Sequence, residues 1–235
     1  MTTRWFPDEW AYAGAEHLDA DFVAGYDRKQ GAVADRDAAE AIEVLTGHGV
    51  GPGSTVVDLG AGTGRFALAA ARRVQRVIAV DVSPGMVDHL RRAVADAGAD
   101  NVECVQAGLL TFEPAGDAVD AVYTRNVLHQ LPDFWKAIAL RRIAGLLRPG
   151  GVLRLHDLVY DVDPGDAEEA IASWLDGAAP RPEDGYTADE LAAHVRDEHS
   201  TFTWLLRPML ERAGFEIVDE RVRRSVYATY TCLRR

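Results

Sequence analysis

Hydrophobic residues along the chain follow two patterns, short continuous runs and longer segments with helical spacing. The short runs end in polar or Gly-rich turns, which is typical of strands buried in a parallel sheet. The predicted strands are Thr55–Leu59, Arg76–Val80, Asn101–Gln106, Ala118–Thr124, Val152–His156, Phe215–Val222 and Val226–Leu233. The other segments repeat apolar residues on one helix face. They are Asp35–Gly47, Arg65–Arg73, a helix that begins at Ser83-Pro84, Asp133–Arg148, Asp166–Asp176, Thr187–Arg196 and Thr203–Ala213.

Capping residues support several of these helix boundaries. Ser83 is expected to cap its helix with Pro84 in the first turn, where proline is well tolerated. Thr187 and Glu190 have the spacing of a capping box. Pro208 lies inside the helix that begins at Thr203, so we expect a kink or a restart there.

The alternation of strands and helices predicts an α/β fold. Such an order is typical of a mostly parallel sheet, here of seven strands, covered by helices on both faces. The last two strands have no helix between them and are expected to form an antiparallel hairpin at the sheet edge. Residues 1–235 are then one domain, with an aromatic and acidic N-terminal cover over 1–34. Residues 159–202 are too long for a simple connection and are interpreted as a lid or helical cap.

Composition excludes several kinds of partner. The net charge of −12 disfavours a nucleic-acid partner, which requires a basic surface. Apolar runs stay well short of the roughly 20 residues that a membrane span needs, so no membrane partner is expected. The N-terminal residues lack the pattern of a signal peptide. We therefore expect a cytoplasmic protein, with Cys104 and Cys232 as free thiols.

A glycine-rich turn follows the strand Thr55–Leu59. Glycines in such a turn let the backbone approach a ligand closely, and the helix that follows offers free N–H groups to an anion. Asp81 ends the next strand, where an acidic side chain meets ribose hydroxyls in dinucleotide-binding folds. The glycine spacing differs from that of a dinucleotide site, because Arg65 occupies the position of the third small residue. A nucleoside cofactor without a pyrophosphate fits this turn better.

The motifs together resemble those of class I S-adenosyl-L-methionine (SAM)-dependent methyltransferases. Val56–Gly64 is similar to the first motif of that family, and Val77–Asp81 with the following Val82–Met86 is similar to the second. Asp120–Pro132 and Leu147–Leu155 resemble the later strand-end motifs. The resemblance covers residues 35–160 closely and the C-terminal hairpin loosely. It implies a Rossmann-like fold with SAM as cofactor and S-adenosyl-L-homocysteine (SAH) as product.

The resemblance also implies which residues hold the cofactor. The glycines would wrap its methionine end, Asp58 would accept hydrogen bonds from its ammonium group, Asp81 would bind the ribose, and Val82 with Met86 would enclose the adenine. Many family members have an Asp where this chain has Gly108, so the adenine amino group is expected to meet the backbone or water here. The full set is Tyr26, Gln30, Asp58, Gly60, Ala61, Gly62, Gly64, Asp81, Val82, Met86, Gly108, Leu109 and Asn126.

The catalytic residues are less clear from the sequence. Methyl transfer needs mainly correct positioning, and a general base only if the acceptor must lose a proton. His129 is the best candidate base, with an equally good alternative as a polar loop residue or one that orients Asn126. His156 and Asp157 end a strand at the same edge, and as neighbours they point to opposite faces. No metal is expected, because these residues lack a tight ligand spacing.

The leading interpretation is methylation of a small molecule. Enzymes that methylate base amino groups carry an Asn/Asp-Pro-Pro-aromatic run after the fourth strand, where this chain has Arg125–Leu128. In enzymes that methylate cytosine at C5, the nucleophilic cysteine follows a proline. Neither cysteine of this chain does so. Methylation of a protein stays open as well. Two further alternatives are a SAM-binding relative with chemistry other than methyl transfer and a non-catalytic SAM-binding regulatory module. An aromatic or apolar acceptor is expected if Trp174, Tyr186 and Trp204 line its pocket rather than pack the cap. The protein is expected to be a monomer or homodimer.

Overall fold

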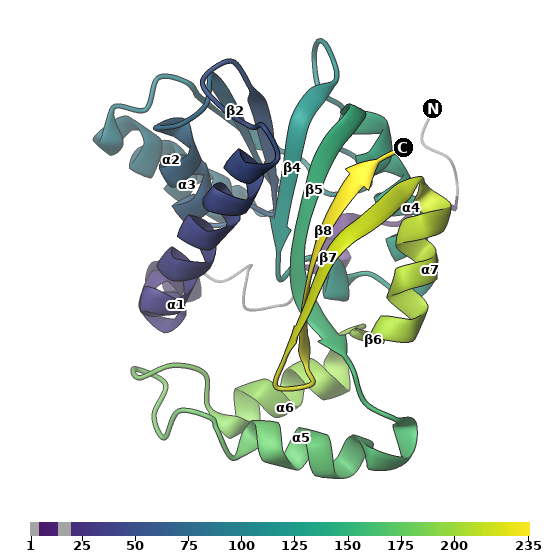
Figure 1. The fold of residues 1–235 in the computed structure, drawn as a ribbon. Helices are drawn as coiled ribbons and strands as arrows, with labels where there is room; N and C mark the ends of the chain where they lie inside the picture. The colour runs from purple at the N-terminus through teal and green to yellow at the C-terminus, as the bar shows by residue number, and fades with distance from the viewer. Residues whose placement is uncertain (1–4, 14–19) are drawn as a thin grey trace.

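One sheet of eight strands runs through the part of the chain that this computed structural model describes, residues 5–13 and 20–235 (Figure 1). Side chains are described for 5–13 and from residue 33 onward. The strand order is β3-β2-β1-β4-β5-β8-β7, with the short β6 paired to β5 outside this path. The strands are β1 (Thr55–Leu59), β2 (Arg76–Asp81), β3 (Val102–Gln106), β4 (Val119–Arg125), β5 (Leu147–Tyr160), β6 (Thr201–Phe202), β7 (Phe215–Arg223) and β8 (Tyr227–Arg234).

Helices cover both faces of the sheet and its lower end. In Figure 1, α1, α2 and α3 lie on one side of the sheet, α4 and α7 lie on the other, and α5 and α6 lie below the end of β5. The α-helices are α1 (Ala20–Gly47), α2 (Arg65–Ala71), α3 (Pro84–Ala97), α4 (Asp133–Leu146), α5 (Ala167–Leu175), α6 (Ala188–Asp197) and α7 (Thr203–Ala213). The described 3₁₀ turns are η1 (Glu9–Tyr12), η3 (Leu128–Gln130) and η4 (Pro164–Asp166).

The structure confirms the predicted architecture. Strands β1 to β5 pair in parallel, β8 runs antiparallel to β5, and β7 and β8 form the expected hairpin. Ser83 caps α3 through a hydrogen bond from the Met86 N–H, and Thr187 and Glu190 form the capping box of α6. Capping residues and the pattern of apolar positions therefore predicted most of the helices and strands correctly.

Several predicted boundaries were wrong. The first helix begins at Ala20 rather than Asp35, because Gly25 and Gly31 weaken a helix without ending it. Helix α4 ends at Leu146 and β5 spans Leu147–Tyr160, because Leu147 already pairs with β4, β8 pairs as far as Leu158, and β6 pairs with the last two residues. Helix α7 continues through Pro208 without a restart.

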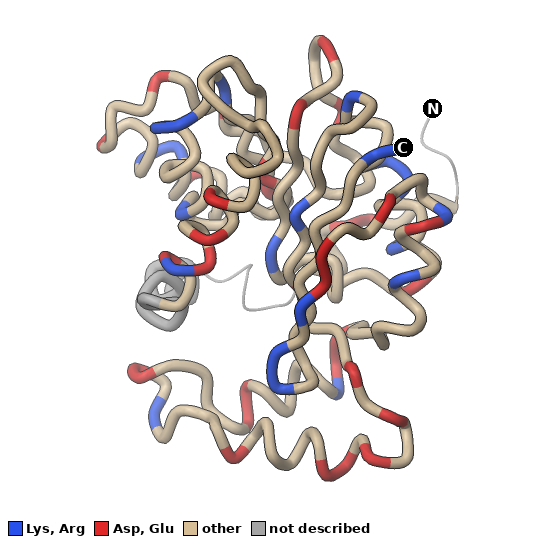
Figure 2. Tube along the Cα trace, in the orientation of Figure 1, with Lys and Arg blue, Asp and Glu red and all other residues tan. Residues whose placement is uncertain are grey.

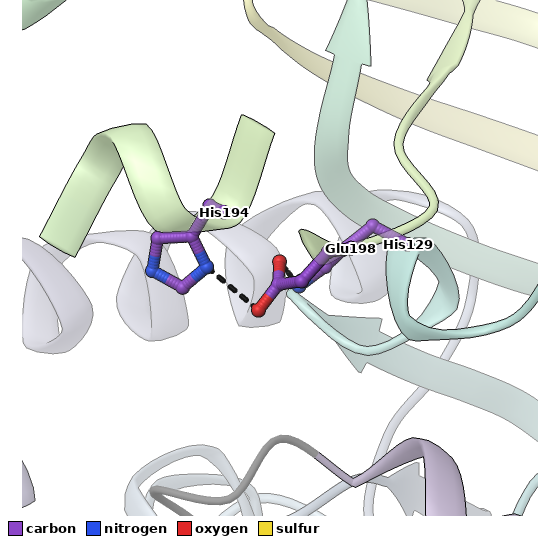
Figure 3. Close-up of side chains that lie close together, drawn as sticks. All are labelled: His129, His194 and Glu198. Atoms are coloured by element: carbon purple, nitrogen blue, oxygen red, sulfur yellow. Dashed lines mark ion pairs between the residues drawn. The ribbon is translucent and has the colours of Figure 1, made fainter. Parts of the chain in front are cut away.

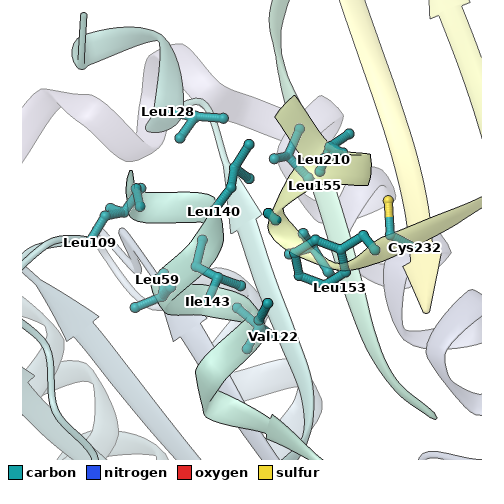
Figure 4. Close-up of a cluster of buried hydrophobic side chains, with 14 of the residues drawn as sticks. Leu59, Leu109, Val122, Leu128, Leu140, Ile143, Leu153, Leu155, Leu210 and Cys232 are labelled. Carbon is teal, nitrogen blue, oxygen red and sulfur yellow. The ribbon is translucent and has the colours of Figure 1, made fainter. Parts of the chain in front are cut away.

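The largest hydrophobic cluster lies between the sheet and the α4–α7 layer (Figure 4). Leu59 and Val122 from the central strands meet Leu140 and Ile143 of α4, and all four side chains are almost fully buried. A second cluster fills the space between the sheet and α1, α2 and α3. Because both faces are covered, β1 is buried along nearly its whole length, as parallel strands usually are.

The lid, residues 159–202, has a small core and a strong charge. Trp174 and Leu191 pack against Leu158 and Val226 at the base of the lid. The segment contains twelve acidic and two basic residues, a net charge of −10 out of −12 for the whole chain. Elsewhere in the described chain, Lys and Arg are interspersed with Asp and Glu on both sides of the sheet (Figure 2). Among the described helices, none has the length and apolar character needed to cross a membrane.

Leu140 offers a test of the packing between α4 and the sheet. Its side chain is fully buried, so Leu140→Ala leaves a cavity and should lower the free energy of unfolding by about 2–5 kcal/mol. Val33→Ala, at a position 41% exposed on α1, is the control and should change stability by less than about 0.5 kcal/mol. Urea unfolding measures both variants, and equal effects would contradict the assigned core.

Candidate functional site

The glycine-rich turn after β1 lies at the carboxyl edge of the sheet, beside the end of β2. Gly60 and Gly62 have φ values of 76° and 53°, in the left-handed region that glycine adopts without strain. The Asp81 carboxylate at the end of β2 accepts a hydrogen bond from the Gly62 N–H at 2.8 Å. A side chain at Gly60 would come within 2.1 Å of Val127, so the turn after β4 packs directly on the glycine turn.

Gly64 has a different function from the two glycines before it. It caps α2 with a φ of 90°, and a Cβ there would lie 2.3 Å from the Leu90 side chain of α3. Its backbone therefore lets α3 approach the first turn of α2. It is not among the residues that line the neighbouring cavities.

A cavity opens above this turn, and most of the predicted cofactor residues line it. We call it the turn cavity. Its main part is lined by Gly60, Gly62, Asp81, Val82, Met86, Gly108, Leu109 and Asn126, among others. A side lobe toward α1 is lined by Asp58, Ala61 and Arg65 together with the same glycines. Tyr26 and Gln30 lie on α1 at positions whose side chains fall outside the described ones.

Two buried oxygen atoms in this region have no hydrogen-bond partner within the described structure, Asp58 Oδ2 and Asn126 Oδ1. Burial, reinforced by the nearby Asp81 charge, raises the pKa of Asp58 to about 8. Asn126 has a φ of 56°, an unusual conformation for a residue other than glycine. Buried polar atoms are normally paired, so both oxygens are suited to a ligand that brings donors. The ammonium group of SAM is such a donor, and the site fits that cofactor.

Glu9 of the N-terminal segment fills the space beside Gly108. Its buried carboxylate accepts hydrogen bonds from the Leu110 N–H at 2.8 Å and the Thr111 hydroxyl at 2.9 Å. A Cβ at Gly108 would lie 2.3–2.4 Å from the Glu9 carboxylate atoms. Burial raises the pKa of Glu9 against the opposing effect of these hydrogen bonds. A carboxylate thus stands on the cavity wall next to the position where many family members have an Asp.

His129 is buried behind the lid rather than exposed to a cavity. Its Nδ1 contacts the Asp157 carboxylate, and its Nε2 lies 3.0 Å from Glu198. Burial opposes a charge on the ring, but the two carboxylates outweigh burial and raise the pKa of His129 to about 10. Glu198 also accepts from His194 Nδ1 at 2.7 Å, as the dashed lines in Figure 3 show. The two carboxylates favour the protonated ring, and a ring in that form has no lone pair with which to remove a proton.

Asp157 and His156 point to opposite faces of β5, as expected for neighbours in a strand. Asp157 is buried and accepts from the backbone N–H groups of Val127, Leu128 and Leu158. His156 lies on the α1 side, where its Nδ1 pairs with the Thr229 hydroxyl at 2.7 Å. Burial and the Arg125 charge lower the pKa of His156 to about 4. The structure therefore brings Asp157 to His129 and leaves His156 apart from both.

A second cavity of about 500 Å³ adjoins the turn cavity, and we call it the lid cavity. Tyr12, Ala13 and Gln130 line both cavities, so the two spaces meet at these residues. The lid side is formed by Glu190, Ala193, His194, Asp197, Glu198 and His199. A molecule in the lid cavity would lie beside a ligand in the turn cavity.

The three candidate acceptor-pocket aromatics, Trp174 and Tyr186 of the lid and Trp204 of α7, do not line either cavity. Trp174 is buried in the core of the lid, and Tyr186 packs against the same cluster. Trp204 is 52% exposed on α7, where it stacks on Phe202. The structure thus favours the alternative in which these aromatics pack the cap, and it removes the reason to expect an aromatic acceptor.

Glu9, His194 and Glu198 were missed by sequence reasoning. Glu9 lies 101 residues before its partner Leu110, and no local pattern connects them. The pair His194 and Glu198 did carry a signal, because residues four apart lie on one face of a helix. The catalytic residues expected from the sequence lie at predicted strand ends or just after them, whereas this pair lies in the lid.

Comparisons with known proteins agree with the resemblance. A family model described as a methyltransferase domain matches residues 56–151. The arsenite methyltransferase of Halobacterium salinarum is 30% identical over 228 residues, covering 90% of this chain. The match covers 49% of that protein, so the chain spans about half the length of this relative. An uncharacterized methyltransferase of Mycobacterium tuberculosis is 31% identical over 153 residues, 60% of this chain and 75% of that protein.

A solved structure shares the whole fold. Magnesium protoporphyrin IX methyltransferase from Synechocystis PCC 6803, crystallised with bound SAH, superposes with a TM-score of 0.70 at 17% sequence identity. The superposition covers 97% of this chain and all of the other. Another crystal structure of that enzyme contains bound SAM.

Asp58 predicts a pH dependence of stability. The carboxyl ionises near pH 4 in an unfolded chain and near pH 8 in the folded one, so raising the pH through that window disfavours folding. We expect the stability of the wild type relative to Asp58→Asn to fall from pH 5 to pH 8 and to level off above it. The measurement is urea unfolding at each pH.

The exposed Asp96→Asn variant is the control for Asp58→Asn and should follow the wild type at every pH. A constant stability difference between the wild type and Asp58→Asn would show that Asp58 is already ionised at pH 5.

Proposed function

Because the chain belongs to the class I SAM-dependent methyltransferase family, we propose that it transfers the methyl group of SAM to a small molecule bound in the lid cavity. The observation that carries this proposal is the junction of the two cavities at Tyr12, Ala13 and Gln130. A donor in one space and an acceptor in the other would meet there, which is the positioning that in-line transfer requires. The proposal treats residues 1–235 as one domain, with 1–34 as cover and 159–202 as lid.

The donor side of the proposal rests on the turn cavity. Asp58 and Asn126 would accept hydrogen bonds from the methionine end of SAM, since each has a buried oxygen without a partner in the described structure. Asp81 would bind the ribose hydroxyls while it keeps its bond to Gly62. Val82 and the buried Met86 would enclose the adenine. When bound, SAM supplies an electrophilic methyl group, and the chain supplies position and shelter from water.

We assign recognition of the adenine amino group to Glu9. The carboxylate lines the turn cavity beside Gly108 and Leu109, where the family reads the adenine edge. Its bonds to Leu110 and Thr111 fix its position and leave acceptor capacity for another donor. The N-terminal segment thus supplies the carboxylate that the β3 loop lacks. Gly108 leaves the room that this carboxylate occupies, because a Cβ there would come within 2.4 Å of it.

Exchanging the two positions tests this assignment. Glu9→Ala removes a hydrogen bond to a charged group worth about 1.5–3 kcal/mol, so the Kd for SAM should rise about 10- to 100-fold. Gly108→Asp alone should also weaken binding, because its side chain meets Glu9. The double variant Glu9→Ala/Gly108→Asp should recover most of the affinity. Isothermal titration calorimetry with SAM gives the Kd values.

A cofactor analogue whose adenine amino group is replaced by a carbonyl separates recognition from a merely structural effect. The wild type should prefer SAM over this analogue, and Glu9→Ala should lose that preference. If Glu9→Ala binds both compounds more weakly by the same factor, Glu9 only supports the loop.

The acceptor side rests on the size and chemistry of the lid cavity. A space of about 500 Å³, partly open to solvent, matches a small molecule better than a protein segment or a nucleic-acid strand. Arsenite, the substrate in the name of the Halobacterium relative, is a thiophilic species. Neither cysteine lines the lid cavity, since Cys104 lies on β3 and Cys232 is a buried residue of β8. The proposed acceptor is therefore an organic molecule with a hydroxyl, amine or thiol group.

Binding and turnover together test the function. We expect SAM and SAH to bind in calorimetry and labelled methyl to be transferred to at least one member of a small-molecule panel. A non-catalytic module would bind both compounds without turnover, and a relative with other chemistry would bind them without methylating any acceptor. Absence of binding up to millimolar concentration would contradict the donor site.

Ala193→Phe tests the lid cavity itself. The new ring would occupy the space proposed for the acceptor, so acceptor KM should rise at least tenfold while the Kd for SAM stays within twofold. Ala192→Phe, next to it but not on the cavity wall, is the matched control and should leave KM unchanged. Equal KM values for the two variants would place the acceptor elsewhere.

A further inference from the structure

We propose that His129, His194 and Glu198 bind a divalent transition-metal ion on the wall of the lid cavity. Two imidazoles and one carboxylate are a donor set that suits zinc, iron(II) or manganese(II). The residues come from η3 and from α6 with the residue that follows it, and Figure 3 shows the Glu198 carboxylate between the two rings. The inferred role of the ion rests on the proposed function, whereas its binding does not.

The three donor groups lie close to the geometry that a metal ion needs. Glu198 Oε2 is 3.0 Å from His129 Nε2, and Glu198 Oε1 is 2.7 Å from His194 Nδ1. All of the ligand atoms lie within 4.8 Å of one another. Metal–ligand bonds of about 2.0–2.2 Å in a tetrahedron place ligand atoms about 3.4 Å apart. His194 is on the lid helix, and a small movement of that ring toward His129 completes the arrangement.

Asp157 gives His129 the support that metal-bound histidines usually have. The Asp157 carboxylate contacts Nδ1 of the ring and is itself held by three backbone N–H groups, from Val127, Leu128 and Leu158. A carboxylate on one ring nitrogen fixes the ring and directs the other nitrogen toward the ion. In this arrangement Nε2 points to Glu198, and the ion replaces the proton between them.

The surroundings also favour a cation. Asp197 and Glu190 line the same cavity wall, and no Lys or Arg is among the described residues that line it. The lid as a whole has a net charge of −10. His194 and Glu198 are on the cavity wall, so an ion between them would be reached from the cavity.

An ion held by three side chains has coordination positions left for a ligand in the cavity. A hydroxyl, thiol or amine bound there would release its proton to water more easily, because the positive charge stabilises the deprotonated form. The acceptor atom would then form its bond to the methyl carbon as the carbon–sulfur bond of SAM breaks and its electron pair stays on sulfur, giving SAH. The ion would thus activate the acceptor from the wall of the cavity in which the acceptor is bound.

Metal titration tests the site on the full-length protein. After dialysis against a chelator, Zn²⁺ is titrated calorimetrically and Co²⁺ by visible absorption, whose intensity reports a tetrahedral site. We expect one ion per chain and a Kd at least tenfold weaker in His194→Ala and in Glu198→Gln. Both side chains are partly exposed on the lid, so these variants keep the buried core intact. His199→Ala, an exposed histidine of the same cavity, is the control and should bind like the wild type.

The outcomes separate this inference from the proposed function. Wild-type affinity in both His194→Ala and Glu198→Gln, or no stoichiometric binding, would overturn the metal site and leave the three residues as a metal-free ion pair network. SAM binding by the metal-free protein measures the donor site independently. Turnover that is unchanged without metal would overturn the role of the ion while methyl transfer stands.

Discussion

One buried carboxylate, that of Asp157, holds the turn after β4 to the end of β5. It accepts from the backbone of Val127 and Leu128 and contacts His129, so three successive residues of that turn depend on it. The same turn presents Asn126 to the turn cavity and packs Val127 on Gly60. The turn cavity and the lid therefore share a single anchor. Burial makes this anchor stiff, because a buried carboxylate without its partners is costly.

The features that were predicted correctly are those that depend on residues close together in the sequence. The glycine turn, Asp81 and the Ser83 cap each depend on neighbouring residues, and their positions follow from strand and helix periodicity. The mostly parallel sheet and the terminal hairpin follow from connection rules that hold across α/β folds. These features define the fold and the donor side of the site.

The parts that were not predicted depend on contacts between distant segments. Glu9 reaches Gly108 only because the N-terminal segment lies across the sheet edge, and the sequence shows no partner for it. The burial of His129 depends on the lid, which brings Glu198 to its outer nitrogen from 69 positions away. A histidine that follows a strand suggests a general base when its neighbours in space are not known. Two carboxylates around it change its protonation state, and with it the chemistry that it can perform.

The charge of the lid has a consequence for how molecules arrive. With −10 of the −12 net charge in one segment, the remainder of the chain is close to neutral, and the molecule is a strong electric dipole with its negative end at the lid. Such a field accelerates the diffusion of cations toward one face and repels anions from it, over a distance set by the Debye length of about 8 Å at physiological ionic strength. Selection between ligands thus begins in the solvent, before any side chain touches them.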